Sequence, residues 1–327
     1  MDLTTARNNL QGCYVTLPTM FHDDDSLSVD YPAIRRHTRF LIDRGLVRDR
    51  AVMLAGGAAG DFSTLTVDER IRVAAEVIDE AGGRVPVVLG AQTASTRELV
   101  HLARAAEDLG ADYIQISPPY YFPHTAGDLY EHVRAASDAA DIGIIVYNTY
   151  WTSSGLTPDS LDALVSLPNV VGLKWSAPDT GFMEFEQVLT KYADQVSIID
   201  NQMRFVTSHM LGAQAIEVHI CNHWPEWGLR MVELLEQHRW DEAQRELVSV
   251  GMPFMQLWGE IEEYTSGDGY LDKLCMELVG LGSSRCRPPT RDIRDSYRHR
   301  ARQMLIETGV PGVVDLDDIT AESVSAK

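Results

Sequence analysis

The sequence predicts a (β/α)₈ barrel (a TIM barrel) followed by a C-terminal helical extension. Short apolar runs of strand type alternate eight times with amphipathic helical stretches, as in a parallel sheet with crossover helices. No G-x-G-x-x-G motif follows the first run, which disfavours a doubly wound dinucleotide-binding sheet. After residue 238 the pattern contains helices alone. A length of 327 residues is common for a barrel that forms one unit.

The predicted elements alternate regularly along the chain. Strands are expected at residues 12–17, 51–56, 85–90, 112–117, 142–147, 169–174, 195–200 and 214–219. Helices are expected near residues 32–45, 67–82, 96–110, 126–140, 157–166, 181–193, 203–211 and 226–237. Two of these helices begin with clear start signals, because Thr66 and Glu69 form a capping-box pattern and Pro158 follows Thr157 at a first helical turn.

The chain is expected to divide into three parts. The barrel occupies residues 1–238, and the helical extension occupies residues 239–310. Helices of the extension are expected near residues 240–264, 268–280 and 291–308, with Pro288 and Pro289 breaking the chain before the last one. Residues 311–327 are rich in Asp, Ser and Thr and are expected to form a mobile tail.

Composition excludes several classes of partner. A formal net charge of -20 argues against nucleic acid and anionic membrane surfaces. The four cysteines show no CxxC pairing, so neither a zinc site nor a disulfide framework is indicated. No basic segment followed by an apolar stretch opens the chain, and no apolar run approaches the roughly 20 residues of a membrane span. We therefore expect a cytoplasmic protein.

Lysine is scarce in this chain, and one lysine ends a predicted buried strand. Of the 28 basic residues only four are lysines, and Lys174 closes the apolar segment 169–174. An amine at that position would be partly desolvated, which frees its lone pair for attack on a carbonyl. The alternatives are a lysine that snorkels out of the strand end or one that pairs with a carboxylate.

The active site of an α/β barrel lies at the carboxyl ends of its strands, and polar residues gather there in this sequence. The candidates are the glycine-rich turn 56–61, Tyr121, Tyr147, Thr152, Lys174, Asn201, Glu217 and His219. An imine between Lys174 and a 2-oxo acid would act as an electron sink, with Tyr147 as the proton shuttle. Backbone amides of the turn, at Gly57, Ala58 and Ala59, would bind the substrate carboxylate. The alternatives are a core tyrosine and a simple strand-to-helix turn.

These residues resemble the dihydrodipicolinate synthase / N-acetylneuraminate lyase family of Schiff-base aldolases and hydro-lyases. Residues 57–66 (GAAGDFSTLT) are similar to the family's G-T-T-G-E-x-x-x-L-T, and Val171–Lys174 is similar to its G-[IL]-K. Tyr147-Asn148 at a strand end also matches, and the resemblance covers nearly the whole chain from Gly12. It implies that Lys174 forms the imine, that Tyr147 relays protons, and that no cofactor is required.

The resemblance also implies an assembly. Tyr121 resembles the tyrosine that in many members reaches a neighbouring subunit's site, which implies a homo-oligomer, commonly a tetramer and otherwise a dimer. Two departures matter for the reaction. Ala58 and Ala59 stand where the family usually offers hydroxyl groups, and the loop 149–155 lacks the arginine by which dihydrodipicolinate synthases recognise a second carboxylate. Synthesis of a lysine precursor is therefore disfavoured.

Two residues of the last strand are unusual additions. Glu217 replaces a family position that is normally apolar, so it is a candidate general base, or a carboxylate that keeps Lys174 protonated until substrate arrives. The alternative for Glu217 is a buried ion pair with an arginine. His219 shares its face by strand alternation and is either an acid/base partner or a core histidine. A metal site at His219, Cys221 and His223 is disfavoured, because a strand end does not space ligands as a helix does.

The leading functional hypothesis is a class I lyase that acts on pyruvate or a pyruvate-derived 2-oxo acid, in aldol cleavage, aldol addition or dehydration. Trp151, Trp175, Phe62 and Tyr150 are expected near the barrel mouth and favour an apolar or aromatic second substrate, such as an aldehyde. One alternative is a dehydratase of 2-oxo-3-deoxy sugar acids. Another is a barrel that binds an oxo acid without catalysis, which would account for the missing hydroxyl groups.

Overall fold

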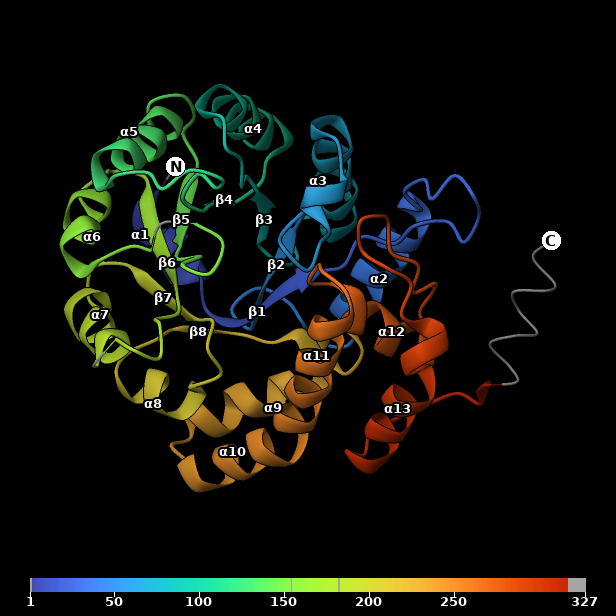
Figure 1. The fold of residues 1–327 in the computed structure, drawn as a ribbon. Coiled ribbons are helices and arrows are strands. Elements are labelled where there is room, and N and C mark those ends of the chain that lie inside the picture. Colours follow the sequence, from blue (N-terminus) through green and yellow to red (C-terminus); the bar gives the residue numbers. More distant parts are fainter. Residues whose placement is uncertain (1, 154, 182, 317–327) are drawn as a thin grey trace.

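A closed barrel of parallel strands forms the centre of the computed structural model, which describes residues 2–153, 155–181 and 183–316 (Figure 1). Within these residues each strand pairs with the next, and the eighth pairs with the first. The strands are β1 Gly12–Leu17, β2 Ala51–Ala55, β3 Val87–Gly90, β4 Tyr113–Ile116, β5 Gly143–Tyr147, β6 Val170–Trp175, β7 Ser197–Asp200 and β8 Ala215–Glu217. The predicted fold class is confirmed, and the predicted strands are correct to within a few residues at their ends.

Helices follow the strands around the outside of the barrel (Figure 1). They are α2 Tyr31–Asp43, α3 Val67–Ala81, α4 Thr96–Leu109, α5 Ala126–Ser137, α6 Pro158–Val165, α7 Glu184–Tyr192, α8 Phe205–Met210 and α9 Pro225–Glu236, with short turns η1 Phe62–Thr64 and η2 His219–Asn222. The capping box of α3 is present, since Thr66 and Glu69 each accept a hydrogen bond from the other's backbone amide.

An N-terminal helix, α1 Leu3–Asn9, closes the amino-terminal end of the barrel and was not predicted. The helix has no regular spacing of apolar residues, and Ala6 is its one buried residue. Tertiary contacts hold it instead. Tyr113 donates a hydrogen bond to the carbonyl of Ala6 at 2.6 Å, and the hydroxyl of Ser197 donates to the carbonyl of Leu10.

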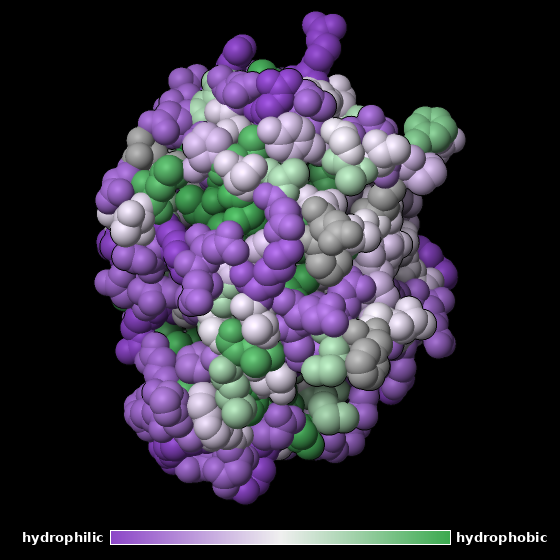
Figure 2. Space-filling view, turned by 90° about the vertical axis from the view of Figure 1, so that its left-hand side faces the viewer, coloured by the Kyte–Doolittle hydropathy of each residue, from purple (hydrophilic) through white to green (hydrophobic). Residues whose placement is uncertain are grey.

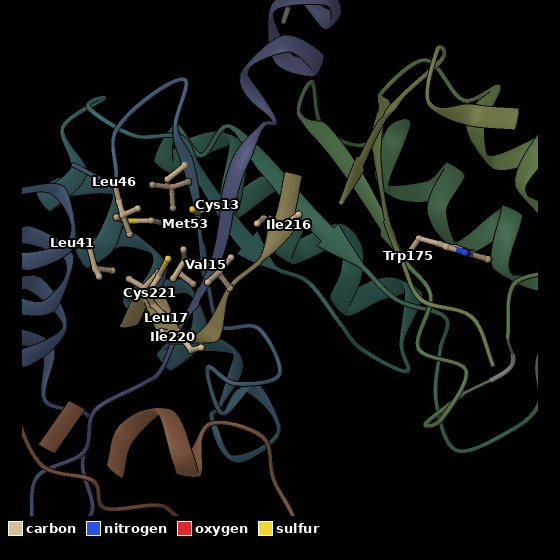
Figure 3. Packing of buried hydrophobic residues seen from close by; sticks show 14 of the residues in the cluster. Cys13, Val15, Leu17, Leu41, Leu46, Met53, Trp175, Ile216, Ile220 and Cys221 are labelled. Carbon is tan, nitrogen blue, oxygen red and sulfur yellow. The ribbon is translucent and has the colours of Figure 1, made fainter. Parts of the chain in front are cut away.

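Strand alternation separates two apolar layers. Tyr14 points into the barrel with an inner cluster completed by Leu10, Val52, Leu54, Val88, Tyr113, Ile145, Val171, Ile199 and Ala215. Cys13, Val15 and Leu17 point the other way, toward the surrounding helices. Figure 3 shows these outer residues beside Met53, Leu41 and Leu46. Since Thr16 shares the inward face with Tyr14, the same alternation directs Thr16 toward the barrel mouth.

The extension begins with a long helical segment in which α10 Trp240–Glu246 and α11 Met252–Tyr264 are joined by a π-helical stretch, Leu247–Gly251. The predicted single helix over 240–264 therefore contains a wider turn. Pro253 has no backbone N–H to donate to the preceding turn, which accounts for the local change of pitch. The helices α12 Tyr270–Leu278 and α13 Arg294–Glu307 follow.

Figure 1 shows α12 and α13 on the same side of the barrel as α2, with α12 next to α13. Arg287 fixes this arrangement by donating hydrogen bonds to the Glu69 carboxylate and to the carbonyls of Leu27 and Thr64. The loop before α12 is thereby brought to the barrel mouth. Most of the expected tail, residues 317–327, lies outside the described residues.

The surface accords with the strongly acidic composition. Figure 2 shows one face of the molecule, where hydrophilic side chains surround smaller hydrophobic groups. Among the described helices, none combines the length and the apolar character needed to cross a bilayer.

Candidate active site

Lys174 lies inside the barrel mouth and not at its surface. Its side chain is buried, and its amine forms an ion pair with the carboxylate of Glu217. The Lys174 Nζ lies 4.3 Å from the ring centroid of Tyr147 and 5.3 Å from that of Tyr14. Tyr147 is also the register partner of Lys174 between β5 and β6. The structure therefore rules out a lysine that snorkels into solvent and places its amine between a carboxylate and two aromatic rings.

Glu217 pairs with Lys174, so the alternative of an ion pair with an arginine is wrong. Its other carboxylate oxygen accepts a hydrogen bond of 2.8 Å from the hydroxyl of Thr16 and lies 3.9 Å from Nε2 of His219. Burial opposes ionisation of Glu217, but the charges of Lys174 and His219 and the hydrogen bonds it accepts hold its pKa below its ordinary value. Glu217 is thus an anion with two cationic neighbours.

His219 is held from the side of the C-terminal extension. Its Nδ1 lies 3.1 Å from a carboxylate oxygen of Asp272 on α12, and its ring contacts Phe254 and Trp258 of α11. Burial alone would lower the pKa of His219, but Asp272 and then Glu217 raise it to about 9. The ring is therefore an imidazolium at neutral pH.

The contacts of Asp272 complete a ring of polar side chains. Its second oxygen accepts a hydrogen bond of 3.2 Å from Nδ2 of Asn222, and the same amide donates to the backbone carbonyl of Thr16 at 3.0 Å. Thr16 in turn bonds to Glu217. Thr16, Asn222 and Asp272 were not predicted as site residues. Strand alternation along β1 was a usable signal for Thr16, whereas no sequence pattern links α12 to the strand ends.

Tyr147 is oriented for donation of its phenolic proton. Its hydroxyl accepts a hydrogen bond of 3.1 Å from Nδ2 of Asn201, which leaves its own proton free for another acceptor. Burial, followed by the charge of Glu217, raises the pKa of Tyr147 well above its ordinary value, so the phenol is neutral. The ring also packs edge-on against Trp151, with 5.8 Å between centroids.

The glycine-rich turn lies next to this group. A Cβ on Gly57 would lie 2.5 Å from Cδ2 of Leu54 and 2.8 Å from the methyl carbon of Thr16, so a larger residue would displace these two side chains. The turn is closed by backbone hydrogen bonds to the carbonyls of Gly57 and Ala58. The amides of Ala58 and Ala59 find no acceptor among the described residues. Unused amides of this kind suit an anion.

The C-terminal extension packs against the glycine-rich turn. Lys273 is fully buried and forms an ion pair of 2.9 Å with Asp61, which ends the turn. Gly269 packs against the backbone of Ala59 so closely that a Cβ there would lie 2.1 Å from the Ala59 carbonyl oxygen. The loop between α11 and α12 is therefore part of the barrel mouth.

Two of the expected site residues lie apart from this cluster. Tyr121 is 87% exposed with a positive φ of 87°, and its ring packs edge-on against Phe122 at 4.8 Å. Thr152 is exposed, and its hydroxyl donates a hydrogen bond to the carbonyl of Thr149.

Trp175, which was expected near the mouth, is fully buried in the outer layer (Figure 3). The expectation for Trp175 is wrong because it follows Lys174 on a strand and so faces the opposite side.

No set of three or more His, Cys, Asp or Glu side chains is arranged as a metal site within the described ranges. His223 is buried and stacks on Phe254 with 6.1 Å between ring centroids. Burial lowers the pKa of His223 to about 3, so its ring is neutral and forms part of the core packing.

Asp268, in the loop before α12, is a further carboxylate at the mouth that the sequence analysis missed. It is partly buried and accepts no hydrogen bond from the described residues. Burial raises its pKa to about 6, the charges of Glu217 and Asp272 also raise it, and those of His219 and Lys174 oppose the increase. Asp268 therefore gains and loses its proton near neutral pH.

Replacing Asp268 with asparagine is expected to stabilise the protein above pH 6. An acid whose native pKa is raised makes folding less favourable as pH rises, here from about pH 4 to about pH 6. We expect a gain of about 1–2 kcal/mol in the free energy of unfolding at pH 8 and none at pH 4. Urea unfolding at both pH values measures it, with Asp25→Asn at an exposed position as the control. An equal change at both pH values would contradict the prediction.

Comparisons with known proteins agree with the barrel architecture. The profile of the "Dihydrodipicolinate synthetase family" matches residues 9–308. The 4-hydroxy-tetrahydrodipicolinate synthase of Nitrosococcus oceani is 35% identical over 201 residues, which are 61% of this chain and 66% of that protein. Its counterpart from Pelobacter propionicus is 31% identical over 239 residues, 72% of this chain and 79% of that protein. The Methanospirillum hungatei enzyme is 26% identical over 90% of this chain and 98% of its own length.

Solved structures of similar proteins share the fold. The dihydrodipicolinate synthase of Aquifex aeolicus gives a TM-score of 0.81 at 22% identity, covering 94% of this chain and all of that chain. The enzyme of Acinetobacter baumannii, solved in complex with pyruvate, gives 0.81 at 23% identity over 92% of this chain and 99% of that chain. At these identities the likeness establishes the architecture.

Proposed function

Because the chain belongs to the dihydrodipicolinate synthetase family, we propose that it is a class I lyase in which Lys174 forms an imine with a 2-oxo acid. The substrate is pyruvate or a 2-oxo acid derived from it, and the reaction is aldol cleavage, aldol addition or dehydration. One observation carries the proposal: the Lys174 amine lies buried at the mouth of the barrel, between the Glu217 carboxylate and the Tyr147 ring. A buried amine with a carboxylate to take its proton is suited to attack on a carbonyl.

The proposed sequence of steps conserves protons within the site. Glu217 takes a proton from Lys174, and the amine lone pair forms a C–N bond to the carbonyl carbon of the substrate while the carbonyl oxygen takes a proton from Tyr147. The extra proton on the lysine nitrogen returns to the Tyr147 phenolate, and protonated Glu217 then gives its proton to the hydroxyl group, which leaves as water and gives the protonated imine. A carboxylate at Glu217 then removes a proton from the adjacent carbon, and the electron pair moves into the imine to give an enamine.

Other residues of the mouth hold the substrate in this proposal. The free amides of Ala58 and Ala59 bind its carboxylate, since backbone N–H groups of a turn favour anions. Asn201 keeps Tyr147 in place through its hydrogen bond to the phenol oxygen. The turn has no hydroxyl groups at positions 58 and 59, where the family usually has them. We therefore assign the proton transfers to Tyr147 and Glu217.

The second substrate is proposed to be apolar or aromatic. Trp151 is 52% exposed and packs edge-on against both Tyr147 and Tyr150. The backbone of Tyr120 pairs with that of Ser153 in the same loop, and the Tyr120 ring lies with 6.4 Å between its centroid and that of Phe62. Aromatic walls of this kind favour a planar or apolar aldehyde over a polyhydroxylated acid. The 149–155 loop carries no arginine, which disfavours the lysine-precursor reaction named for the relatives and leaves the sugar-acid dehydratase as the second enzyme candidate.

Tyr121 and Phe122 support an assembly of identical subunits. Both rings are exposed, at 87% and 65%, and Tyr121 has a positive φ that is unusual for a bulky residue. Exposed aromatic residues with a strained backbone are expected where a partner covers them. We propose that they pack against a second copy of this chain in a tetramer or dimer, which analytical ultracentrifugation would reveal.

Borohydride reduction tests the imine directly. Incubation with pyruvate and a panel of 2-oxo acids, followed by reduction and peptide mass mapping, is expected to place an adduct on Lys174. The peptides containing Lys191 and Lys273 serve as internal controls, because one amine is exposed and the other is buried in an ion pair with Asp61. Absence of an adduct with every oxo acid would reject the mechanism. An adduct without product turnover would favour a barrel that only binds.

Replacing Glu217 with glutamine is expected to lower turnover by at least about a hundredfold, the usual scale for loss of a general base. The amide keeps the volume of the side chain but accepts no proton from Lys174. The matched control is Glu80→Gln, which removes a carboxylate paired with Arg39 on the outer surface of the barrel. Turnover equal to that of the wild type would remove Glu217 from the mechanism.

A further inference from the structure

His219 is a fixed cation at the mouth of the barrel with one unused N–H group. Its Nδ1 lies 3.1 Å from a carboxylate oxygen of Asp272, which is fully buried on α12. The second oxygen of Asp272 accepts a hydrogen bond from Asn222, so the carboxylate is held in place. Nε2 of His219 has no hydrogen-bond acceptor among the described residues, since the nearer oxygen of Glu217 lies 3.9 Å away. The proton on Nε2 is therefore available to a substrate.

The position of His219 places Nε2 beside the atoms that react. Glu217 lies between the two groups, because one of its oxygens pairs with the Lys174 amine and the other faces Nε2. An aldehyde that adds to the enamine would carry its oxygen roughly 4–5 Å from the lysine nitrogen, as ordinary bond lengths require. The side chain of His219 is 23% exposed, so the ring is not sealed into the core. A group that borders both Glu217 and the open mouth is within reach of that oxygen.

We propose that His219 is the general acid toward the second substrate and gives its Nε2 proton to the aldehyde oxygen as the carbon–carbon bond forms. This inference rests on the proposed function and adds a catalytic residue to it. In this step the enamine carbon forms a bond to the aldehyde carbon, and the lysine nitrogen becomes part of a protonated imine again. The aldehyde oxygen takes the proton of His219. Asp272 is a positioning residue, because it acts through the imidazole.

Protons and charge balance through this step. Glu217 holds the proton that it removed from the substrate methyl group, so Glu217 is neutral while His219 donates. The positive charge passes from the imidazolium to the imine nitrogen, and Asp272 stays ionised throughout. The water that hydrolyses the imine then returns a proton to His219, and Glu217 returns its proton to the released amine of Lys174. The site thereby regains the imidazolium and the ion pair between Lys174 and Glu217.

The groups packed around His219 keep it protonated at neutral pH. Burial would lower the pKa of His219, but Asp272 on α12, Glu217 on β8 and Asp268 in the loop before α12 raise it to about 9. Phe254 and Trp258 cover the ring from α11 and carry no charge. The proton that the step requires is therefore present at neutral pH and is lost as the pH rises through about 9.

The fate of the enamine separates this role from a structural one. Exchange of the pyruvate methyl hydrogens in heavy water needs Lys174, Tyr147 and Glu217 and proceeds without an aldehyde. Addition is measured as the initial rate of hydroxy oxo acid formation from pyruvate with benzaldehyde, furfural or propanal. For His219→Gln we expect addition at least about a hundredfold below that of the wild type and exchange within about fivefold of it. Equal losses of the two activities, or unchanged addition, would overturn the inference.

The pH dependence of the ratio of addition to exchange tests the part played by Asp272. In the wild type this ratio is expected to fall above about pH 9, as His219 loses its proton. Asp272→Asn should lower the pH of this fall by at least about one unit, because an amide no longer favours the imidazolium. Glu277→Gln is the matched control, since that buried carboxylate on α12 bonds to Ser284 and Arg298 and should leave the profile unchanged. A fall at the same pH in the wild type and in Asp272→Asn would contradict the inference.

Two results for the wild type distinguish this inference from the proposed function. If pyruvate gives neither hydrogen exchange nor an adduct on Lys174, the proposed function is rejected, and the role of His219 with it. If exchange occurs without addition to any of the three aldehydes, the role of His219 is overturned and the imine mechanism stands.

Discussion

Replacing Lys174 with arginine is expected to abolish the imine adduct and to lower turnover by at least about a thousandfold. The guanidinium keeps a positive charge opposite Glu217, so the buried carboxylate retains a partner. Unlike an amine, however, a guanidinium does not lose its proton in a protein and offers no nucleophilic lone pair. Steady-state turnover and borohydride trapping with pyruvate measure both effects.

The matched control for this substitution is Lys191→Arg. Lys191 pairs with Asp162 at the surface, where both side chains are about half exposed. That variant should keep full turnover and a normal adduct on Lys174. Retention of more than about a tenth of the activity by Lys174→Arg would mean that the chemistry does not pass through an imine at this residue.

The second large effect concerns stability. Replacing Lys273 with methionine is expected to lower the free energy of unfolding by about 3–5 kcal/mol, because it leaves the carboxylate of Asp61 buried and unpaired. Lys273 also contacts the Thr19 carbonyl and lies over the ring of Phe21 at 4.8 Å, so methionine preserves much of the packing volume. Equilibrium unfolding in urea at pH 7 measures the difference.

Lys191→Met provides the comparison within the same chain. Its ion pair with Asp162 is solvated, and loss of such a pair changes stability by less than about 1 kcal/mol. Since Asp61 ends the glycine-rich turn, we also expect Lys273→Met to slow imine formation by loosening the turn. Equal destabilisation by the two variants would show that Asp61 finds another partner, contrary to the expectation.

Local patterns were sufficient for most of the fold. The alternation of apolar runs with amphipathic stretches predicted the barrel, and Thr66 with Glu69 predicted the start of α3. These signals are local because backbone capping and the periods of helix and strand depend on residues close in sequence. The helix α1 was missed because its seven polar-rich residues carry no period of their own and are held by contacts with Tyr113 and Ser197.

Part of the candidate site could also be predicted from local sequence patterns. Lys174 and Tyr147 end neighbouring strands, and Glu217 and His219 were assigned to one face by the two-residue period of a strand. The same period explains the error at Trp175, because a residue one position beyond Lys174 on the strand faces the outer layer. Tyr121 keeps the role implied by the resemblance only if another subunit covers it.

The sequence alone therefore determined the elements of the barrel, apart from α1, and which residues occupy the strand ends. The tertiary structure decided what those residues contact. Asp272 and Asp268 lie about fifty residues beyond His219 in the chain, on an extension whose docking depends on contacts such as Arg287 with Glu69. Periodicity specifies the face of an element and carries no information about which distant helix packs over it. The charge of His219, the second cation beside Glu217, was set only when α12 brought Asp272 against the mouth of the barrel.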